Sequence, residues 1–175
     1  LVVTGGTFDQ DPKAYVTTPY VVIKKSDNEY NVIKGVAKIG ETYYASLQEA
    51  IGNVANGETI NLLVACAENV SIEQNEGVSF TIDGQIAENT KVQYTGTISI
   101  DGNEGYDRPE TLTIKNINFN NVSTTALTYI SAKETQSHNV TIESCVFDGN
   151  SNTIAKGIQV SEGNNWTVKG CTVNN

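Results

Sequence analysis

A short stretch of sequence that recurs along the second half of the chain constrains the fold more than any other feature. The segment "VTIESCVFDGN" at 140–150 returns as "LTIKNINFNNV" at 112–122 and as "WTVKGCTVNN" at 166–175. Repeats with a period of roughly 20–50 residues are typical of stacked architectures, because one unit cannot bury its apolar face alone. The chain is therefore expected to form stacked coils, each of which supports the next.

Within each copy the apolar residues alternate, skip one position at a bend, and alternate again. Successive side chains of a strand point to opposite faces, so this phase slip predicts two short strands joined at a corner, both with their apolar residues inward. Aligning the copies gives inward columns. Their members are Ile82, Ile114, Ile142 and Val168 in one column, Cys145 and Cys171 in a second, and Phe119 and Phe147 in a third.

The outward positions support the same alignment. Side chains of alternating charge would lie above one another at a spacing of about 4.8 Å, where opposite charges contribute a few tenths of a kcal/mol per pair. This column contains Asp83, Lys115, Glu143 and Lys169. The segments 128–132 and 158–162 are expected to form a third strand in successive coils.

A short helix is predicted upstream, in "ASLQEAIGNVANGETINLL" at 45–63. Ser46 and Glu49 form a capping box, and the apolar residues that follow recur at helical spacing, so the helix is expected over 46–55 with Gly57 as its stop signal. Two peripheral β-hairpins are expected before it. Their strands are "YVVIKK" and "EYNVIK" around 26–28, and "VAKI" and "TYYA" around 40–41.

The helix "SLQEAI", the following "GETINL" and the copies of "LTIKNINF" resemble the right-handed parallel β-helix of the pectin-lyase-like superfamily. The stretch "VTGGTFDQDPKAYV…YNVIKGVAKIGETYYASLQEAI" resembles a recurring segment of long extracellular repeat proteins of gut bacteria, commonly described as adhesin-like. The resemblance implies an all-β solenoid, opened by one short N-terminal capping helix. It also implies an extracellular or bacterial cell-surface location.

The domain organisation follows from this reading. Residues 45–175 are expected to form the β-helix domain, truncated at its C-terminus, and residues 1–44 to combine the tail of a preceding coil with linker hairpins. Residues 1–10 fit the repeat, since Leu1, Val3 and Phe8 fall where apolar residues stand in later copies. We expect a fragment of a longer surface protein. In the alternative, residues 1–10 complete the open end of a neighbouring copy and give head-to-tail self-association.

Charge and hydropathy exclude two classes of partner. With 20 acidic against 11 basic residues the net charge is −9, and no cluster of lysine or arginine exists to neutralise phosphates. Nucleic acid is therefore not expected as a partner. No apolar run approaches the roughly 18 residues of a membrane span, so membrane insertion is not expected either.

Polysaccharide lyases of the resembled fold place a basic residue beside a calcium ion. The loop "NEGYDRPE" contains the only arginine, and Tyr106, Asp107 and Arg108 are the candidate ligand-binding residues. The D-x-N spacing of Asp101 and Asn103, with Asp107, makes these three the candidate calcium ligands. The acids of this loop share no column, so a charged surface loop is the simpler interpretation.

The sequence gives little support to other catalytic patterns. Glycoside hydrolases of this fold use paired carboxylates, whereas here Lys115 separates Asp83 from Glu143. His138 has no nucleophile that the sequence assigns to it. Cys145 and Cys171 lie within disulfide reach, but parallel, in-register side chains suit stacked thiols better than a bridge.

These observations favour a non-enzymatic module for adhesion or presentation, with a glycan or a host surface protein as partner and no cofactor beyond calcium in the 101–110 loop. Two alternatives stay open. One is a fragment of a polysaccharide-active lyase or hydrolase, and the other is a structural subunit that polymerises head-to-tail through residues 1–10.

Overall fold

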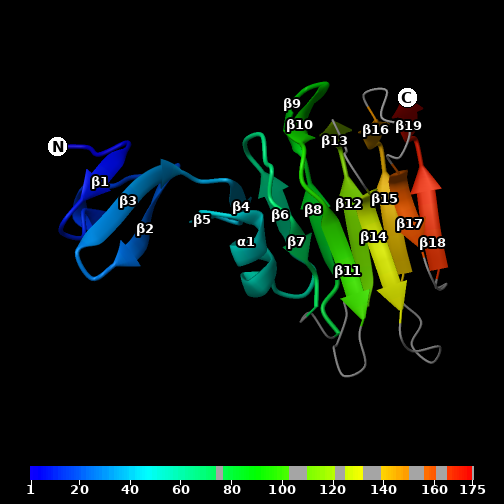
Figure 1. Ribbon diagram of the computed structural model, residues 1–175, viewed down its shortest axis with the longest axis horizontal. Helices are drawn as coiled ribbons and strands as arrows, with labels where there is room; N and C mark the ends of the chain where they lie inside the picture. Colours follow the sequence, from blue (N-terminus) through cyan, green and yellow to red (C-terminus); the bar gives the residue numbers. More distant parts are fainter. Residues whose placement is uncertain are drawn as a thin grey trace.

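The computed structural model is elongated, with a small sheet at the N-terminus followed by a larger group of mainly parallel sheets (Figure 1). The structure describes residues 1–73, 77–102, 110–120, 125–131, 139–149, 156–160 and 165–174, without the side chains of 101–102 and 129–131. The protein is mostly β, as predicted, with one short α-helix.

The N-terminal sheet contains three antiparallel strands in the order β1-β3-β2, which are β1 (Gly6–Phe8), β3 (Glu29–Lys34) and β2 (Tyr20–Ser26). A 3₁₀ turn, η1 (Lys13–Tyr15), lies in the connection between β1 and β2. The predicted first hairpin, β2–β3, is present.

Residues 1–10 lie outside the parallel sheets of the larger part of the molecule, and their assignment to the tail of a preceding coil stays a prediction. Gly6, Thr7 and Phe8 pair with Val32, Asn31 and Tyr30 of β3. The β2–β3 hairpin leaves one edge of β3 with unpaired backbone groups, and β1 satisfies them.

The second predicted hairpin is also present, but it is not peripheral. It consists of β4 (Ala37–Ile39) and β5 (Thr42–Tyr44), and β4 pairs on its other side with β6 (Thr59–Leu62). Ala37 and Ile39 are buried in the main core. A three-residue strand with a lysine at its centre looks polar in sequence, although both flanking side chains point inward.

The helix α1 (Leu47–Asn53) covers the first turn of the larger part of the molecule. The Ser46 side chain accepts a hydrogen bond from the Glu49 N–H at 3.0 Å, and Glu49 in turn accepts one from the N–H of Ala45, one residue before the cap. The predicted apolar face is buried, with Leu47, Ala50 and Ile51 at most 2% exposed. The helix ends at Asn53, two residues before the predicted end.

Three sheets make up the larger part of the molecule. Sheet 1 has seven strands in the order β5-β4-β6-β8-β12-β15-β18, sheet 2 has five in the order β9-β10-β13-β16-β19, and sheet 3 has four in the order β7-β11-β14-β17. The further strands of sheet 1 are β8 (Phe80–Asp83), β12 (Thr111–Lys115), β15 (Asn139–Glu143) and β18 (Asn165–Lys169). Sheet 2 contains β9 (Gln85–Ala87), β10 (Thr90–Tyr94), β13 (Ile117–Asn120), β16 (Val146–Asp148) and β19 (Thr172–Asn174). Sheet 3 contains β7 (Val70–Ser71), β11 (Ile98–Gly102), β14 (Thr125–Ser131) and β17 (Lys156–Val160).

From β8 onward the chain visits sheets 1, 2 and 3 in the same order, and successive circuits are joined by parallel strand pairs; β9 is the exception, since it pairs antiparallel with β10. In sheet 1, Ile82, Ile114, Ile142 and Val168 are successive Cα partners, as in the inward column aligned from the sequence. In sheet 2, Phe119, Phe147 and Val173 are partners in the same way. We call this set of paired circuits the stack.

Each circuit turns from sheet 1 into sheet 2 at a tight corner. The residue after the sheet 1 strand is in the left-handed region in three circuits, with φ of 56° at Asn116, 53° at Ser144 and 60° at Gly170. This residue causes the phase slip seen in the sequence. Gly84 stands at the same position one circuit earlier, where a Cβ atom would lie 2.6 Å from the carbonyl oxygen of Asn116.

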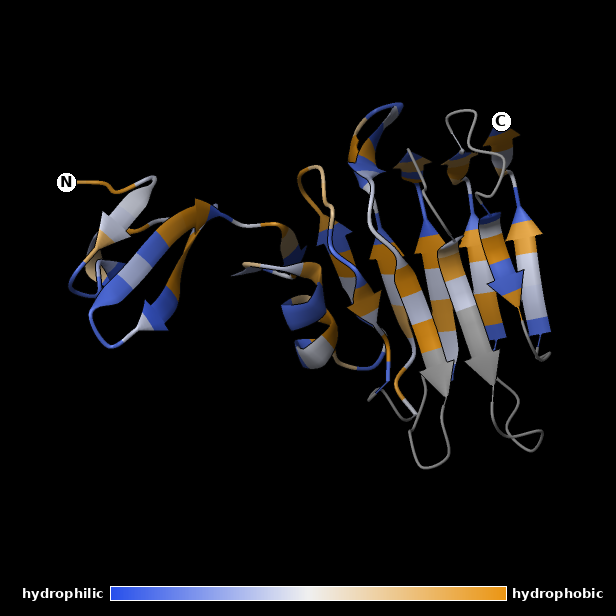
Figure 2. Ribbon diagram, in the orientation of Figure 1, coloured by the Kyte–Doolittle hydropathy of each residue, from blue (hydrophilic) through white to orange (hydrophobic). Residues whose placement is uncertain are grey.

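The core of the stack is continuous from α1 to the later circuits, and the alternation of apolar and polar residues along its strands is visible in Figure 2. The Phe119 ring lies between Tyr94, at a centroid distance of 5.5 Å, and Phe147, stacked at 5.1 Å. Val168 and Val173, the last members of their columns, are 53% and 76% exposed. Among the described residues there is no helix with the length and apolar character needed to cross a membrane.

Candidate functional site

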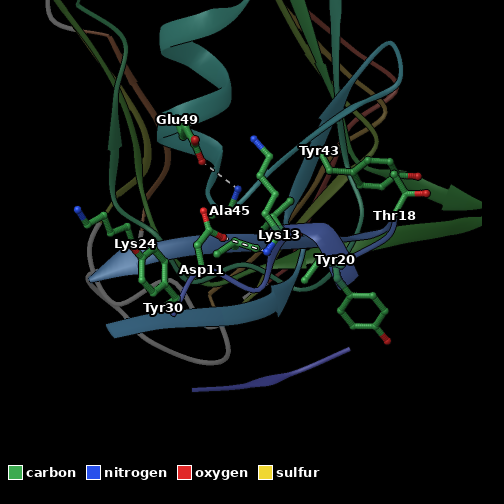
Figure 3. Close-up of a pocket in the computed structure, with 12 residues that line it drawn as sticks. Asp11, Lys13, Thr18, Tyr20, Lys24, Tyr30, Tyr43, Ala45 and Glu49 are labelled. Atoms are coloured by element: carbon green, nitrogen blue, oxygen red, sulfur yellow. Dashed lines mark hydrogen bonds between the residues drawn. The ribbon is translucent and has the colours of Figure 1, made fainter. Parts of the chain in front are cut away.

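A cavity of about 500 Å³ lies where the N-terminal sheet faces the β5–α1 end of the stack (Figure 3). We call it the N-terminal cavity. Its walls come from the η1 segment, the β2–β3 hairpin, β5 and α1. The lining residues are Asp11, Lys13, Val16, Thr18, Tyr20, Val21, Val22, Lys24, Tyr30, Tyr43, Ala45 and Glu49.

Three tyrosines supply the aromatic surface of the cavity. Tyr20 and Tyr30 come from β2 and β3, and Tyr43 comes from β5 across the cavity; all three are half-buried. Tyr43 is held by packing, since a Cβ atom on Gly35 would lie only 3.1 Å from its ring. The Lys38 ammonium lies 5.6 Å from the centroid of the same ring, which is cation–π distance.

Two carboxylates of the cavity are fixed by backbone groups. Asp11 Oδ1 accepts a hydrogen bond from the N–H of Lys13 at 2.9 Å, and Glu49 Oε2 accepts one from the N–H of Ala45 at 2.9 Å. Each carboxylate thus has one oxygen engaged in shaping its own turn and a second oxygen available as an acceptor.

The two lysines of the cavity differ in their interactions. Lys24 Nζ forms an exposed ion pair with Asp27 at 3.0 Å. The Lys13 ammonium forms no hydrogen bond or ion pair with any residue that the structure describes, and its side chain extends toward α1 in Figure 3. Lys13 is exposed to solvent, so its three N–H groups can be offered to a ligand.

The charge of the molecule is distributed unevenly. Residues 1–44 contain five lysines and five acidic residues and are neutral overall, whereas residues 45–175 contain six basic and fifteen acidic residues. The whole net charge of −9 thus belongs to the stack and its loops. The N-terminal cavity lies mainly against the neutral part of the chain.

The cavity can bind a ligand through stacking and hydrogen bonds. Among its lining residues there is no cysteine or histidine, and the part of the chain that the structure describes contains no group of three or more His, Cys, Asp or Glu able to hold a metal ion. The described lining therefore offers recognition chemistry without a nucleophile activated by a neighbouring imidazole base.

The candidate ligand and calcium residues of the 101–110 loop fall largely outside the described residues. Asn103, Tyr106, Asp107 and Arg108 lie in the 103–109 gap, and only the backbone of Asp101 is described, where it pairs with Ile130. Calcium binding by this loop stays a prediction. His138 lies outside the described residues as well.

Two outward carboxylates of the stack, Asp83 and Glu143, form ion pairs between circuits. Asp83 Oδ2 lies 3.2 Å from Lys115 Nζ, and Glu143 Oε2 lies 3.3 Å from Lys169 Nζ. Asp83 Oδ1 also accepts a hydrogen bond from Asn116 at 2.9 Å. These contacts link successive circuits along the column of alternating charge.

All three cysteines are free thiols. The Cys145 and Cys171 thiols point to carbonyl oxygens of the preceding circuit, with Sγ–O distances of 3.7 Å to Ile114 and to Ile142. Burial raises the pKa of Cys145 to about 12, and burial also raises the pKa of Cys66. At neutral pH these buried thiols are protonated and poor nucleophiles.

Sequence reasoning did not identify the N-terminal cavity. The missing information is spatial, because the hairpin at 20–34 and the turn at 43–49 meet only after folding. The available signal was the concentration of tyrosine and lysine in two polar hairpins beside the helix.

Comparison of the chain with known protein families, with curated proteins and with solved structures gave no match.

Proposed function

We propose that the protein is a right-handed parallel β-helix module of a secreted or bacterial cell-surface protein, and that it works by adhesion or presentation. The observation that carries this proposal is the register of the stack. Parallel pairs in three sheets, visited in a constant order, are the arrangement expected of a β-solenoid. Parallel crossover connections are right-handed in almost all proteins, which favours the right-handed form.

The stack has properties suited to holding a binding surface in a fixed place. Its core residues contact the circuits before and after them, and ion pairs connect the outward faces. A module of this kind resists bending, since displacing one circuit would break the backbone hydrogen bonds of three sheets. Its acidic surface also opposes non-specific association with other acidic surfaces.

Small-angle scattering tests the architecture. An elongated particle whose length matches the arrangement in Figure 1 is expected, and a compact spherical profile would overturn the β-helix assignment. Adhesion is tested by binding of the labelled chain to mucin, to bacterial cell walls and to arrays of host glycans. Binding to none of these would remove adhesion and leave presentation.

Catalysis on polysaccharides is the principal competing function. Incubation with pectins and host glycans should yield neither reducing ends nor unsaturated products. If turnover is observed and Arg108→Ala abolishes it, the non-enzymatic proposal is wrong.

Self-association is a second candidate, because residues 1–10 fit the repeat that forms the paired circuits. Head-to-tail contact through residues 1–10 would require β1 to leave β3, because the two strands are paired. Size-exclusion chromatography at rising concentration tests this, and a strictly monomeric chain would exclude it.

A further inference from the structure

We propose that the N-terminal cavity binds a short neutral saccharide. This inference deepens the proposed adhesive function and rests on it for its biological purpose. The site itself is inferred from the cavity's size, its aromatic walls and its balance of polar groups.

The size of the cavity is suited to a small ligand. Its volume of about 500 Å³ lies within the range of roughly 300–1,000 Å³ that is typical of small-molecule sites. Walls from four separate segments, η1, β2–β3, β5 and α1, let the cavity contact a ligand from more than one side.

The aromatic walls favour a ligand with flat apolar faces as well as polar edges. Tyrosine has an apolar ring and a hydroxyl that both donates and accepts hydrogen bonds. A pyranose ring presents C–H groups on its faces and hydroxyls around its rim, so it can stack on Tyr20, Tyr30 or Tyr43 while its hydroxyls are hydrogen-bonded. Because Tyr43 is already fixed against Gly35, ordering its ring on binding costs little conformational entropy.

The polar groups favour a hydroxyl-rich ligand over a charged one. Lys13 offers donors, while the outer oxygens of Asp11 and Glu49 offer acceptors. A sugar hydroxyl can donate to a carboxylate and accept from an ammonium at once, so it matches both kinds of group.

A charged ligand matches the same groups less well. An anion would satisfy Lys13 but would lie beside two carboxylates, and Lys24 is already paired with Asp27. A cation would meet the unpaired Lys13 ammonium. The lining contains two carboxylates and two ammonium groups, so a ligand of either sign meets repulsion as well as attraction, which a neutral ligand avoids.

The first test is calorimetric titration of the intact chain with a panel of saccharides. The neutral members are maltotriose, cellotriose, xylotriose and lacto-N-tetraose, and the acidic comparators are sialyllactose and trigalacturonic acid. Binding of at least one neutral saccharide is expected. Binding of none at millimolar concentration, or binding of acidic members alone, overturns the proposal.

Variants then assign the binding to the cavity. Lys13→Gln and Asp11→Asn should each weaken binding about tenfold or more, because each removes a charge-assisted hydrogen bond. Asn at position 11 retains a carbonyl acceptor for the Lys13 N–H, so the local turn is preserved. The matched control is Lys25→Gln, an exposed lysine of β2 that does not line the cavity, and it should leave the affinity unchanged.

A measurement without mutation guards against misfolded variants. On titration with the bound saccharide, amide chemical-shift changes should concentrate at Val22, Ala45 and their neighbours in the cavity wall. Changes confined to the stack would overturn the site. The outcomes also separate this inference from the proposed function: an elongated particle that binds no saccharide removes the site alone, whereas a compact particle that binds one removes the β-helix assignment alone.

Discussion

The N-terminal sheet and the stack are built on opposite principles. Within the three strands of the N-terminal sheet, all of which the structure describes, Val32 is the one buried residue, and it lies outside the main core cluster. The stack buries a continuous set of apolar columns, many of them fully inaccessible. The sheet is antiparallel and electrically neutral, whereas the stack is largely parallel and carries the net charge.

The comparison indicates that the stack supplies most of the stability, whereas the N-terminal sheet supplies much of the surface for recognition. A three-stranded sheet with one buried side chain in its strands is near the lower limit for independent stability, so much of its order depends on backbone pairing and on packing against β5, where Gly35 lies against Tyr43. Regions that bind ligands are commonly drawn from the less stable parts of a protein. The N-terminal cavity lies on this boundary, between the well-packed stack and the sparsely packed N-terminal sheet.

The largest expected effect is removal of the central aromatic ring of the stack. Phe119→Ala should lower the free energy of unfolding by about 3–5 kcal/mol, since the side chain is fully buried between Tyr94 and Phe147. Denaturant titration measures the change. Ile86→Ala, at a residue that is 45% exposed, is the control and should change stability by at most about 0.5 kcal/mol. Equal losses would contradict the view that the buried columns, and not the exposed positions, hold the stability of the stack.

Next in size is a methyl group added at the tight corner. Gly84→Ala should cost roughly 1–3 kcal/mol, because the new Cβ would lie 2.6 Å from a backbone oxygen and 2.7 Å from Ile117. The matched control is Gly52→Ala in α1, where the new Cβ would lie in open space. This substitution should raise the free energy of unfolding by about 0.5–1 kcal/mol. If both glycines tolerate alanine equally, close approach of successive circuits is not what requires Gly84.

A smaller and local loss of stability is expected in the N-terminal sheet. Val32→Ala removes two methyl groups from its one buried aliphatic side chain and should cost about 1.5 kcal/mol. Hydrogen exchange should become faster for β2 and β3 while the amides of β12 and β15 keep their protection. Faster exchange throughout the stack would mean that the two parts unfold as one unit.

Alkaline pH should weaken the stack selectively. Burial raises the pKa of Cys145 from 9.0 to about 12, so the unfolded chain releases this proton at lower pH than the folded chain. The stability that the protonated thiol contributes is fully present below about pH 9 and is lost as the pH rises toward 12. At pH 10 the free energy of unfolding should have fallen by roughly 1 kcal/mol.

Unfolding titrations of the native chain and of Cys145→Ala measure this effect. The variant should lose stability less steeply between pH 8 and pH 10. Parallel curves for the two proteins would show that this thiol does not contribute to the pH dependence.

The smallest expected effect is an increase in stability, at the corner between β15 and β16. Ser144 adopts φ of 53°, which glycine reaches at lower cost, so Ser144→Gly should add about 0.5–1 kcal/mol. Asn116→Gly should gain less, because Asn116 donates a hydrogen bond to Asp83. Thermal unfolding of both variants distinguishes relief of backbone strain from loss of that hydrogen bond.

The regular part of this molecule could be predicted from local patterns. Alternation fixes which side chains of a strand face inward, and the shared phase slip aligns one circuit with the next, so the sheet 1 columns coincide with the observed register. The Ser46 cap and the spacing of Leu47, Ala50 and Ile51 likewise place the helix within a few residues.

The rest depends on choices between partners that are distant in sequence. Residues 1–10 match the repeat, yet β1 pairs with β3. The free edge of β3 has unpaired backbone groups, and a short strand nearby can pair with them whatever its sequence pattern. The β4–β5 hairpin joins sheet 1 through β6, a pairing that its polar sequence does not reveal. The cavity requires both of these outcomes, so it could not be derived before the sheets were assembled.

The corners of the stack also bear on how such a protein changes during evolution. Ile82, Ile114, Ile142 and Val168 are separated by 32, 28 and 26 residues, yet they remain partners in one register. Differences in length between circuits are thus absorbed away from the paired strands of sheet 1. Duplication or loss of one repeat in the gene would lengthen or shorten the module by a single strand spacing of about 4.8 Å and leave the neighbouring repeats intact. The reach of the protein can be adjusted stepwise, without redesign of its interior.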